Sequence, residues 1–312
     1  METRWRTYVA GACCLLLAAI ARPGVFCGVF AGEAPKAKVV FLAGPCGHPP
    51  GTHEAAAGAR LLKHCLENAK DIQPVRAEVF DKWPGEPALR DAATIVLTGD
   101  IFPPEQMDQP AKIKAELAKL MDRGCGMVCI HYATGLRAQH VAEDGSHPLL
   151  GWLGGYYSSG CPHHRSAARV CPATIVPAEG DHPVLRGWRE FTFDDEPYWN
   201  IYFGKGGLSK NVVPLATSML PPEKPRKEIV AWAVQRKDGG RGMGIVLPHY
   251  FRSWRVDDLR TLVLNGICWT AKLEVPQEGV KSSLPELSTF KPASVDPRPR
   301  PKKNKKKQRP KK

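Results

Sequence analysis

The chain has 312 residues, of which 43% are hydrophobic and 24% charged, a composition typical of a globular protein with a sizeable core. Its formal net charge is +13, but residues 291–312 carry +10 and residues 1–31 carry +2. The +1 that remains for residues 32–290 gives no support for nucleic acid as a specific partner of the folded body.

The first 31 residues have the pattern of a secretory signal peptide. Two arginines precede an apolar run over residues 8–20, and Val29-Phe30-Ala31 offers a small-residue cleavage site. An uncleaved membrane anchor is the alternative, but Arg22-Pro23-Gly24 leaves the apolar stretch short of the roughly 20 residues that cross a bilayer. We therefore expect an exported protein, located in the periplasm, at the cell surface or outside the cell.

Cleavage would leave seven of the ten cysteines, an odd number that does not suggest a disulfide framework. A single bridge between Cys161 and Cys171 stays open in an oxidising compartment. The favoured interpretation is that most of these cysteines are small buried hydrophobes.

Alternating strand and helix patterns follow in chain order. Apolar runs predict strands at 37–44, 75–80, 93–98 and 126–131, and three- to four-residue periodicity predicts helices at 53–68 and 109–121. Such an order is typical of a doubly wound, mostly parallel α/β sheet.

The second half of the chain is less regular. Residues 145–225 are rich in glycine, proline and aromatic residues, which predicts loops and short strands over the sheet edge. A hairpin follows, with strands at 229–235 and 243–248 around Lys237-Asp238-Gly239-Gly240. A helix at 259–271 closes a domain over residues 32–275. Residues 276–312 are expected to form a disordered, basic tail that binds anionic surface polymer or has no function.

Three of the predicted strands end at histidines. His48 and His53 follow the first strand, His131 ends the strand at 126–131, and His249 follows the last strand. Because ligands bind at the carboxyl ends of strands in open α/β sheets, these four histidines are expected to line one functional site.

A second group of polar residues lies between residues 145 and 200. His163 and His164 are adjacent in a loop, and Asp195 and Glu196 precede the aromatic Tyr198. Carboxylates beside aromatic rings suit sugar binding, but a solvated acidic turn with a buried aromatic explains the pattern equally well.

Several kinds of site find no support in the sequence. It has no paired Cys-x-x-Cys or His-Glu-x-x-His zinc motif. It also lacks a P-loop and a Gly-x-Gly-x-x-Gly loop after the first strand, so no nucleotide is expected. The Gly-x-Ser-x-Gly motif of α/β-hydrolases is absent too.

Dispersed motifs resemble those of the ThuA-like (trehalose utilisation) family. They are the strand and turn at 126–135, the segment 182–188 leading to 195–198, the segment 240–249 and the segment 264–271. The resemblance covers residues 38–272. It implies a class I glutamine amidotransferase-like, flavodoxin-like fold and a role in the metabolism of sugars, especially oxidised (keto) disaccharides.

Amidotransferases of this fold place a nucleophilic cysteine at the turn after the strand equivalent to 126–131. Here that position resembles His131, and Cys129 lies two residues upstream, inside the strand. Without an activated thiolate, glutamine hydrolysis through an acyl-enzyme is not expected.

The residues therefore support two hypotheses. In the first, the protein is an enzyme that hydrolyses or isomerises a sugar or keto-sugar. His131, His249 and Glu196 are then catalytic, and the substrate contacts are His48, His53, His163, His164, Asp195 and Tyr198. A divalent metal such as zinc, held by His48, His53, His131 and His249, is a variant of it. In the second, the protein binds carbohydrate or acts as a scaffold without catalysis.

Overall fold

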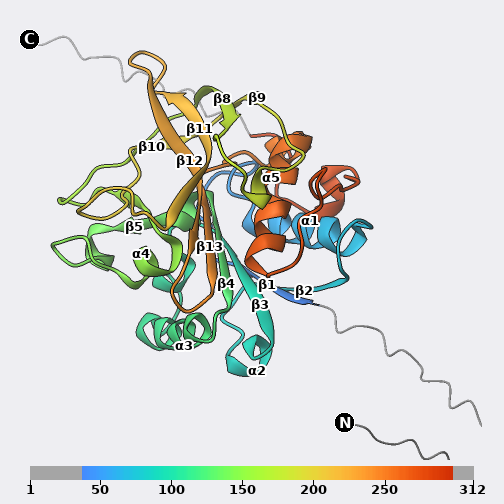
Figure 1. The fold of residues 1–312 in the computed structure, drawn as a ribbon, viewed down its shortest axis with the longest axis horizontal. Helices are drawn as coiled ribbons and strands as arrows, with labels where there is room; N and C mark the ends of the chain where they lie inside the picture. The colour runs from blue at the N-terminus through green and yellow to red at the C-terminus, as the bar shows by residue number, and fades with distance from the viewer. Residues whose placement is uncertain (1–36, 298–312) are drawn as a thin grey trace, which may run out of the picture. The chain divides into compact units, whose positions relative to one another are not determined.

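A nine-stranded sheet, in the order β2-β1-β3-β4-β13-β12-β11-β8-β9, forms the centre of the computed structural model, which describes residues 37–297 (Figure 1). Its first five strands are parallel to one another. They are β2 (Val75–Phe80), β1 (Ala37–Ala43), β3 (Ala92–Thr98), β4 (Gly126–Ile130) and β13 (Arg241–Ile245). β1, β3 and β4 are almost wholly buried, which explains their continuous apolar runs.

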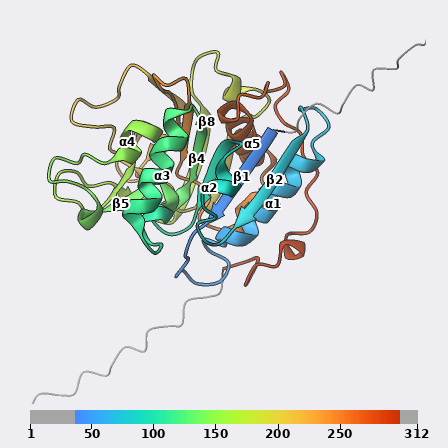
Figure 2. The ribbon, with the colours of Figure 1, turned by 90° about the horizontal axis from the view of Figure 1, so that it is seen from below.

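Helices cover both faces of this parallel part. α1 and α5 lie on one side, and α3 and α4 on the other (Figures 1 and 2). The helices are α1 (Ala55–Asn68), α2 (Glu86–Leu89), α3 (Pro110–Asp122), α4 (Pro148–Leu153) and α5 (Asp257–Thr270). The predicted doubly wound, flavodoxin-like sheet is thereby confirmed.

Four antiparallel strands extend the sheet beyond β13. β12 (Arg226–Gln235) forms the predicted hairpin with β13. β11 (Val212–Leu220), β8 (Cys171–Pro177) and β9 (Phe191–Asp195) continue it. The prediction of loops and short strands over the sheet edge at 145–225 missed this extension, because the irregular register of β11 and the proline within it, Pro214, blur the two-residue alternation.

Short pairs and turns complete the description. β10 (Tyr198–Trp199) pairs with β7 (Ala167–Ala168), and β5 (Gly135–Arg137) pairs with β6 (Tyr157–Ser159). The 3-10 turns are η1 (Pro103–Glu105), η2 (His131–Thr134), η3 (Ala138–His140), η4 (Pro183–Leu185), η5 (Phe251–Arg255) and η6 (Leu287–Phe290).

The segment after α5 is ordered, so the prediction of a disordered tail from residue 276 is wrong for 276–297. Val280, Leu287 and Phe290 are buried against the domain. The Arg60 guanidinium on α1 donates to the Phe290 carbonyl at 2.6 and 3.0 Å. Isolated apolar anchors in a proline-rich stretch leave no periodicity for sequence analysis to detect. Residues 298–312 lie outside the described part.

Two further predictions concern export and the cysteines. The predicted signal peptide, residues 1–31, lies outside the described residues, so export stays a prediction. Between residues 37 and 297, no helix has both the length and the apolar character to cross a bilayer. All seven cysteines in this part are free and six are buried, and Cys161 and Cys171 form no bridge.

Candidate functional site

Loops at the carboxyl ends of four parallel strands bring polar side chains together. The loop after β1 supplies His48 and His53, and the loop after β3 supplies Asp100. His131 follows β4 directly, and His249 follows β13. The predicted convergence of the four histidines is what the structure shows, since their rings stack or meet edge to face.

His131 occupies the sharp turn after β4. Its φ of 52° is in the left-handed region, which costs a non-glycine residue about 1–3 kcal/mol and is over-represented at active sites. Its Nδ1–H donates to the carbonyl of Val246 at 2.8 Å, which leaves a lone pair on Nε2. The hydroxyl of Tyr198 donates to that nitrogen at 2.9 Å. His131 is therefore a neutral imidazole whose Nε2 is directed at the ring of His249.

His53 has the same kind of arrangement. It too has a positive φ, of 43°. Its Nδ1–H donates to Oδ1 of Asp100 at 2.5 Å. Its Nε2 is buried and has no hydrogen-bond partner. Burial, opposed in part by Asp100, lowers the pKa of His53 to about 4. The buried ring thus presents an unpaired lone pair to its neighbours.

His249 lies between His131 and the carboxylate of Glu196. Its Nδ1 lies 3.2 Å from Nε2 of His131 and 3.2 Å from Oε2 of Glu196. Its backbone carbonyl accepts a hydrogen bond from the backbone N–H of His53 at 2.9 Å. The loops after β1 and β13 are thereby held in register with each other.

Asp195 holds the backbone of His249 and Glu196 in place through hydrogen bonds. It was predicted to bind substrate, but its side chain is fully buried. Its Oδ1 accepts from the backbone N–H groups of His249 at 2.7 Å and Glu196 at 2.6 Å, and its Oδ2 accepts from the hydroxyl of Ser253 at 2.5 Å. Asp195 therefore positions two residues of the cluster. A carboxylate at the end of an edge strand cannot be told from a substrate ligand by sequence alone.

One nitrogen or oxygen from each of His53, His131, Glu196 and His249 lies within 4.8 Å of the other three. We call these four residues the histidine cluster. Burial holds the pKa of His131 well below its usual value. Burial raises the pKa of Glu196, but the hydrogen bond with His249 and the electrostatic effect of the neighbouring histidines together outweigh burial, and the pKa is lowered. Neutral imidazoles and one carboxylate are the donor set of a divalent transition-metal site.

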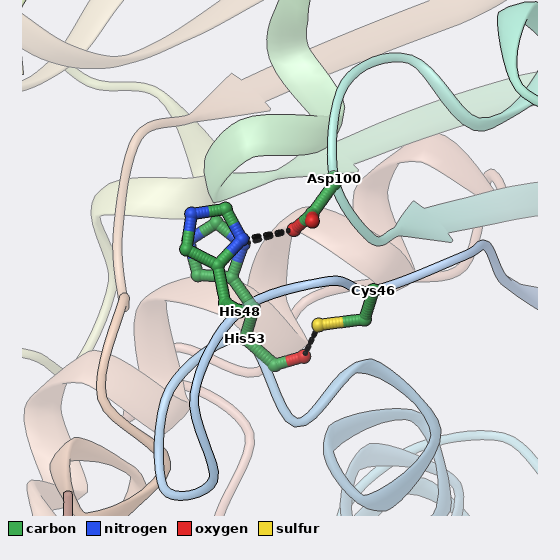
Figure 3. A group of neighbouring side chains, drawn as sticks. All are labelled: Cys46, His48, His53 and Asp100. Atoms are coloured by element: carbon green, nitrogen blue, oxygen red, sulfur yellow. Dashed lines mark hydrogen bonds and ion pairs between the residues drawn. The ribbon is translucent and has the colours of Figure 1, made fainter.

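A second group of possible ligands is Cys46, His48, His53 and Asp100 (Figure 3). In this group, the polar side chains form hydrogen bonds with one another and with the backbone. His48 donates from Nδ1 to Oδ1 of Asp100 at 2.7 Å, on the oxygen that also accepts from His53. The thiol of Cys46 donates to the His53 carbonyl at 2.8 Å, and burial raises its pKa to about 11. This group therefore orients the histidines and is not a ligand set of its own.

The remaining predicted residues have different positions. Tyr198 joins the cluster as a buried hydrogen-bond donor. His163 and His164 do not, because they line a separate cavity with Tyr202. Nε2 of His163 lies 2.9 Å from the Tyr156 hydroxyl, and Nε2 of His164 donates to the carbonyl of Asn200 at 2.7 Å.

Asp100 is the functional residue that sequence reasoning missed. It follows β3 as the histidines follow their strands, and this position at a strand end was the available signal. A lone aspartate after Gly99 is equally typical of a turn, so the pattern alone did not single it out.

Comparisons with known proteins agree with this fold. No protein-family model and no curated protein matches the chain. Among solved structures, a protein of Bacteroides uniformis assigned as ThuA-like is 15% identical, with a TM-score of 0.56, over 76% of this chain and 92% of its own. One of Parabacteroides merdae, assigned likewise, is 17% identical, with a TM-score of 0.52, over 81% of this chain and 94% of its own. The chain has the fold of these ThuA-like proteins.

Proposed function

We propose that the protein is a metal-dependent enzyme that hydrolyses or isomerises a sugar or keto-sugar at the histidine cluster. The observation that carries this proposal is the group of four donor atoms within 4.8 Å of one another. Ligand atoms about 2.1 Å from a common zinc ion lie roughly 3 to 4 Å apart, so small side-chain shifts would suffice.

The surroundings of the ring nitrogens support a metal site. Metal-bound histidines almost always donate their other ring N–H to a carboxylate or a backbone carbonyl. His53 does so to Asp100, and His131 to the Val246 carbonyl. The proposal therefore gives His131 and His249 the role of metal ligands in place of proton transfer.

An ion would change two contacts within the cluster. It would take the lone pair of His131 that now accepts the Tyr198 proton, and the hydroxyl would turn to another acceptor. It would also replace the proton between His249 and Glu196. A divalent ion bound there would supply Lewis-acid polarisation of a sugar oxygen or an activated water.

His48 is the cluster neighbour best placed to contact substrate. Its side chain is 33% exposed, whereas that of His53 is 2% exposed. Asp100 holds its Nδ1, and the ring stacks on His53 with centroids 3.7 Å apart. The opposite edge of the ring remains available for hydrogen bonding or proton exchange with a bound hydroxyl.

The substrate class rests on the likeness to ThuA-like proteins and on the chemistry that this chain lacks. Cys129 lies in β4 with no exposed surface, and burial raises the pKa of its thiol strongly. A thiolate nucleophile for glutamine hydrolysis is therefore not formed at this position. A sugar, rich in hydroxyl and carbonyl oxygens, suits a site built from a metal ion and a half-exposed imidazole.

Turnover measurements test the proposal directly. The purified protein is incubated with glycosides and their keto forms, with zinc, with manganese and with a chelator. We expect turnover that the chelator abolishes and that His131→Ala reduces at least a hundredfold. His64→Ala, on α1 and outside the cluster, serves as control. Sugar binding without any product under all metal conditions would contradict the proposal and favour a non-catalytic binding protein.

A further inference from the structure

A second cavity lies beside the histidine cluster at the carboxyl edge of the sheet. It has a volume of about 610 Å³ and is formed by the loops after β2 and β3 and the start of α3. A neighbouring cavity of about 360 Å³ is lined by His48 and His53. Pro45 and Asp81 line both cavities, so the two adjoin along this edge.

The wall of the larger cavity carries an aromatic ring in a fixed orientation. Trp83 is half-buried, and its indole N–H donates to Oε2 of Glu116 at 2.6 Å. Gln106 also lines this cavity, and its Nε2 is buried without a hydrogen-bond partner. Buried donors are nearly always paired, so this amide is suited to an acceptor on a ligand.

The charges around the cavity favour a neutral ligand. Asp81, Asp108 and Glu116 contribute three carboxylates, and Lys82 and Lys112 contribute two ammonium groups. A site for a phosphorylated or acidic sugar needs a surplus of positive charge. Interspersed donors and acceptors beside an aromatic ring instead match the hydroxyls and the apolar face of a neutral sugar.

We infer that this cavity, called here the Trp83 subsite, binds a further sugar unit of a neutral oligosaccharide whose reacting unit lies at the histidine cluster. This inference rests on the proposed function and assigns the second sugar unit of its substrate to the cavity lined by Trp83. Trp83 supplies the stacking surface. Gln106, Asp81 and Asp108 supply hydrogen bonds to hydroxyls.

Calorimetry with a panel of sugars tests the inference. Glucose is compared with trehalose, maltose, cellobiose and maltotriose on the zinc-loaded protein. We expect at least one oligosaccharide to bind about tenfold more tightly than glucose, a gain of about 1.4 kcal/mol that lies within the range of an aromatic stacking contact. Trp83→Ala should remove that gain and leave glucose binding unchanged. Trp83→Phe should retain part of it, because a ring is still present.

Trp152→Ala is the matched control, because Trp152 on α4 is also half-buried and is not part of this cavity. If every oligosaccharide binds no more tightly than glucose, or if Trp83→Ala retains the gain, the subsite is refuted. A zinc titration of the same samples separates the two proposals. If the wild type binds no zinc, the metal site is refuted. If it binds zinc but binds glucose and every oligosaccharide equally tightly, only the subsite is refuted.

Discussion

His53 donates a hydrogen bond of 2.5 Å from Nδ1 to Asp100, and this bond determines which ring nitrogen of His53 is free to bind a metal ion. Because the Nδ1 proton of His53 is committed to the carboxylate, its Nε2 faces His131 and His249, whose ring centroids lie 4.6 and 4.7 Å away. The same carboxylate oxygen also accepts from His48. One residue after β3 therefore orients two histidines of the loop after β1.

Replacement of this carboxylate tests its positioning role. Asp100→Asn keeps the shape but offers one amide oxygen to two imidazole donors and removes the negative charge. We expect zinc affinity to fall by about 10- to 100-fold, as is usual when a partner behind a metal ligand is changed. Competition against a chromophoric zinc chelator measures this change.

Asp122→Asn provides the control for that experiment, since Asp122 is an exposed aspartate at the end of α3. Circular dichroism shows whether both variants fold. Equal zinc affinity of folded Asp100→Asn and wild type would show that Asp100 does not position His53.

Ser253→Ala tests the support beneath His249. The Ser253 hydroxyl donates to Oδ2 of Asp195, a fully buried carboxylate, so its removal leaves that oxygen unpaired. We expect the free energy of unfolding to fall by about 1–3 kcal/mol. Urea denaturation measures it, with Ser283→Ala at an exposed position for comparison. A loss no larger than that of Ser283→Ala would argue against this hydrogen bond.

Because of Glu105, we expect the free energy of unfolding to fall in acid. Burial raises its pKa, but hydrogen bonds from His147 at 2.9 Å and Lys114 at 2.5 Å outweigh burial and lower it to about 2 from 4.5. A carboxyl with a depressed folded-state pKa stabilises the fold above its unfolded pKa. This contribution, about 3 kcal/mol, should fade below pH 4.5 and be gone near pH 2.

Unfolding curves between pH 2 and pH 7 check the prediction for Glu105. The Glu105→Gln variant should be less stable than wild type at pH 7, and the difference should shrink as the pH falls toward 2. A difference that stays constant with pH would mean that ionised Glu105 contributes no such stability.

Two truncations test the ordered segment after α5. Both oxygens of Glu54, next to His53, accept from backbone N–H groups of this segment, at Ala293 and Ser294. Ending the chain after residue 285 removes these bonds and the buried Leu287 and Phe290, each worth about 1.5–3 kcal/mol. We expect a markedly lower melting temperature and weaker zinc binding.

The truncation after residue 297 is the matched control, because it removes only the basic end of the chain. Thermal unfolding monitored by circular dichroism compares the two. If both shortened chains melt with the wild type, the packing of Leu287 and Phe290 contributes nothing measurable to stability.

The sequence was sufficient to predict the parallel part of the fold and the meeting of four histidines. Apolar runs identified β1, β3 and β4, and a hairpin pattern identified β13. Because the carboxyl ends of parallel strands share one edge, His53, His131 and His249 were expected to lie near one another. Glu196 was also predicted as a site residue, from its place among carboxylates and aromatic residues.

The rest depends on long-range contacts that local patterns do not encode. Asp100 meets His53 across 47 positions, and the backbone of His249 meets Asp195 across 54. The positive φ values of His53 and His131 depend on the surrounding fold, because only a few per cent of non-glycine residues adopt them. Sequence patterns therefore identified the four residues of the histidine cluster, but they missed Asp100 and gave Asp195 a substrate contact in place of its positioning role.

Isothermal titration of the purified, chelator-treated protein with zinc decides whether the histidine cluster is a metal site. We expect the wild type to bind one ion per chain. Glu196→Gln and His131→Ala should each lose this binding, while His64→Ala should retain it. If the folded wild type binds no zinc, or if both cluster substitutions leave binding unchanged, the histidine cluster is not a metal site.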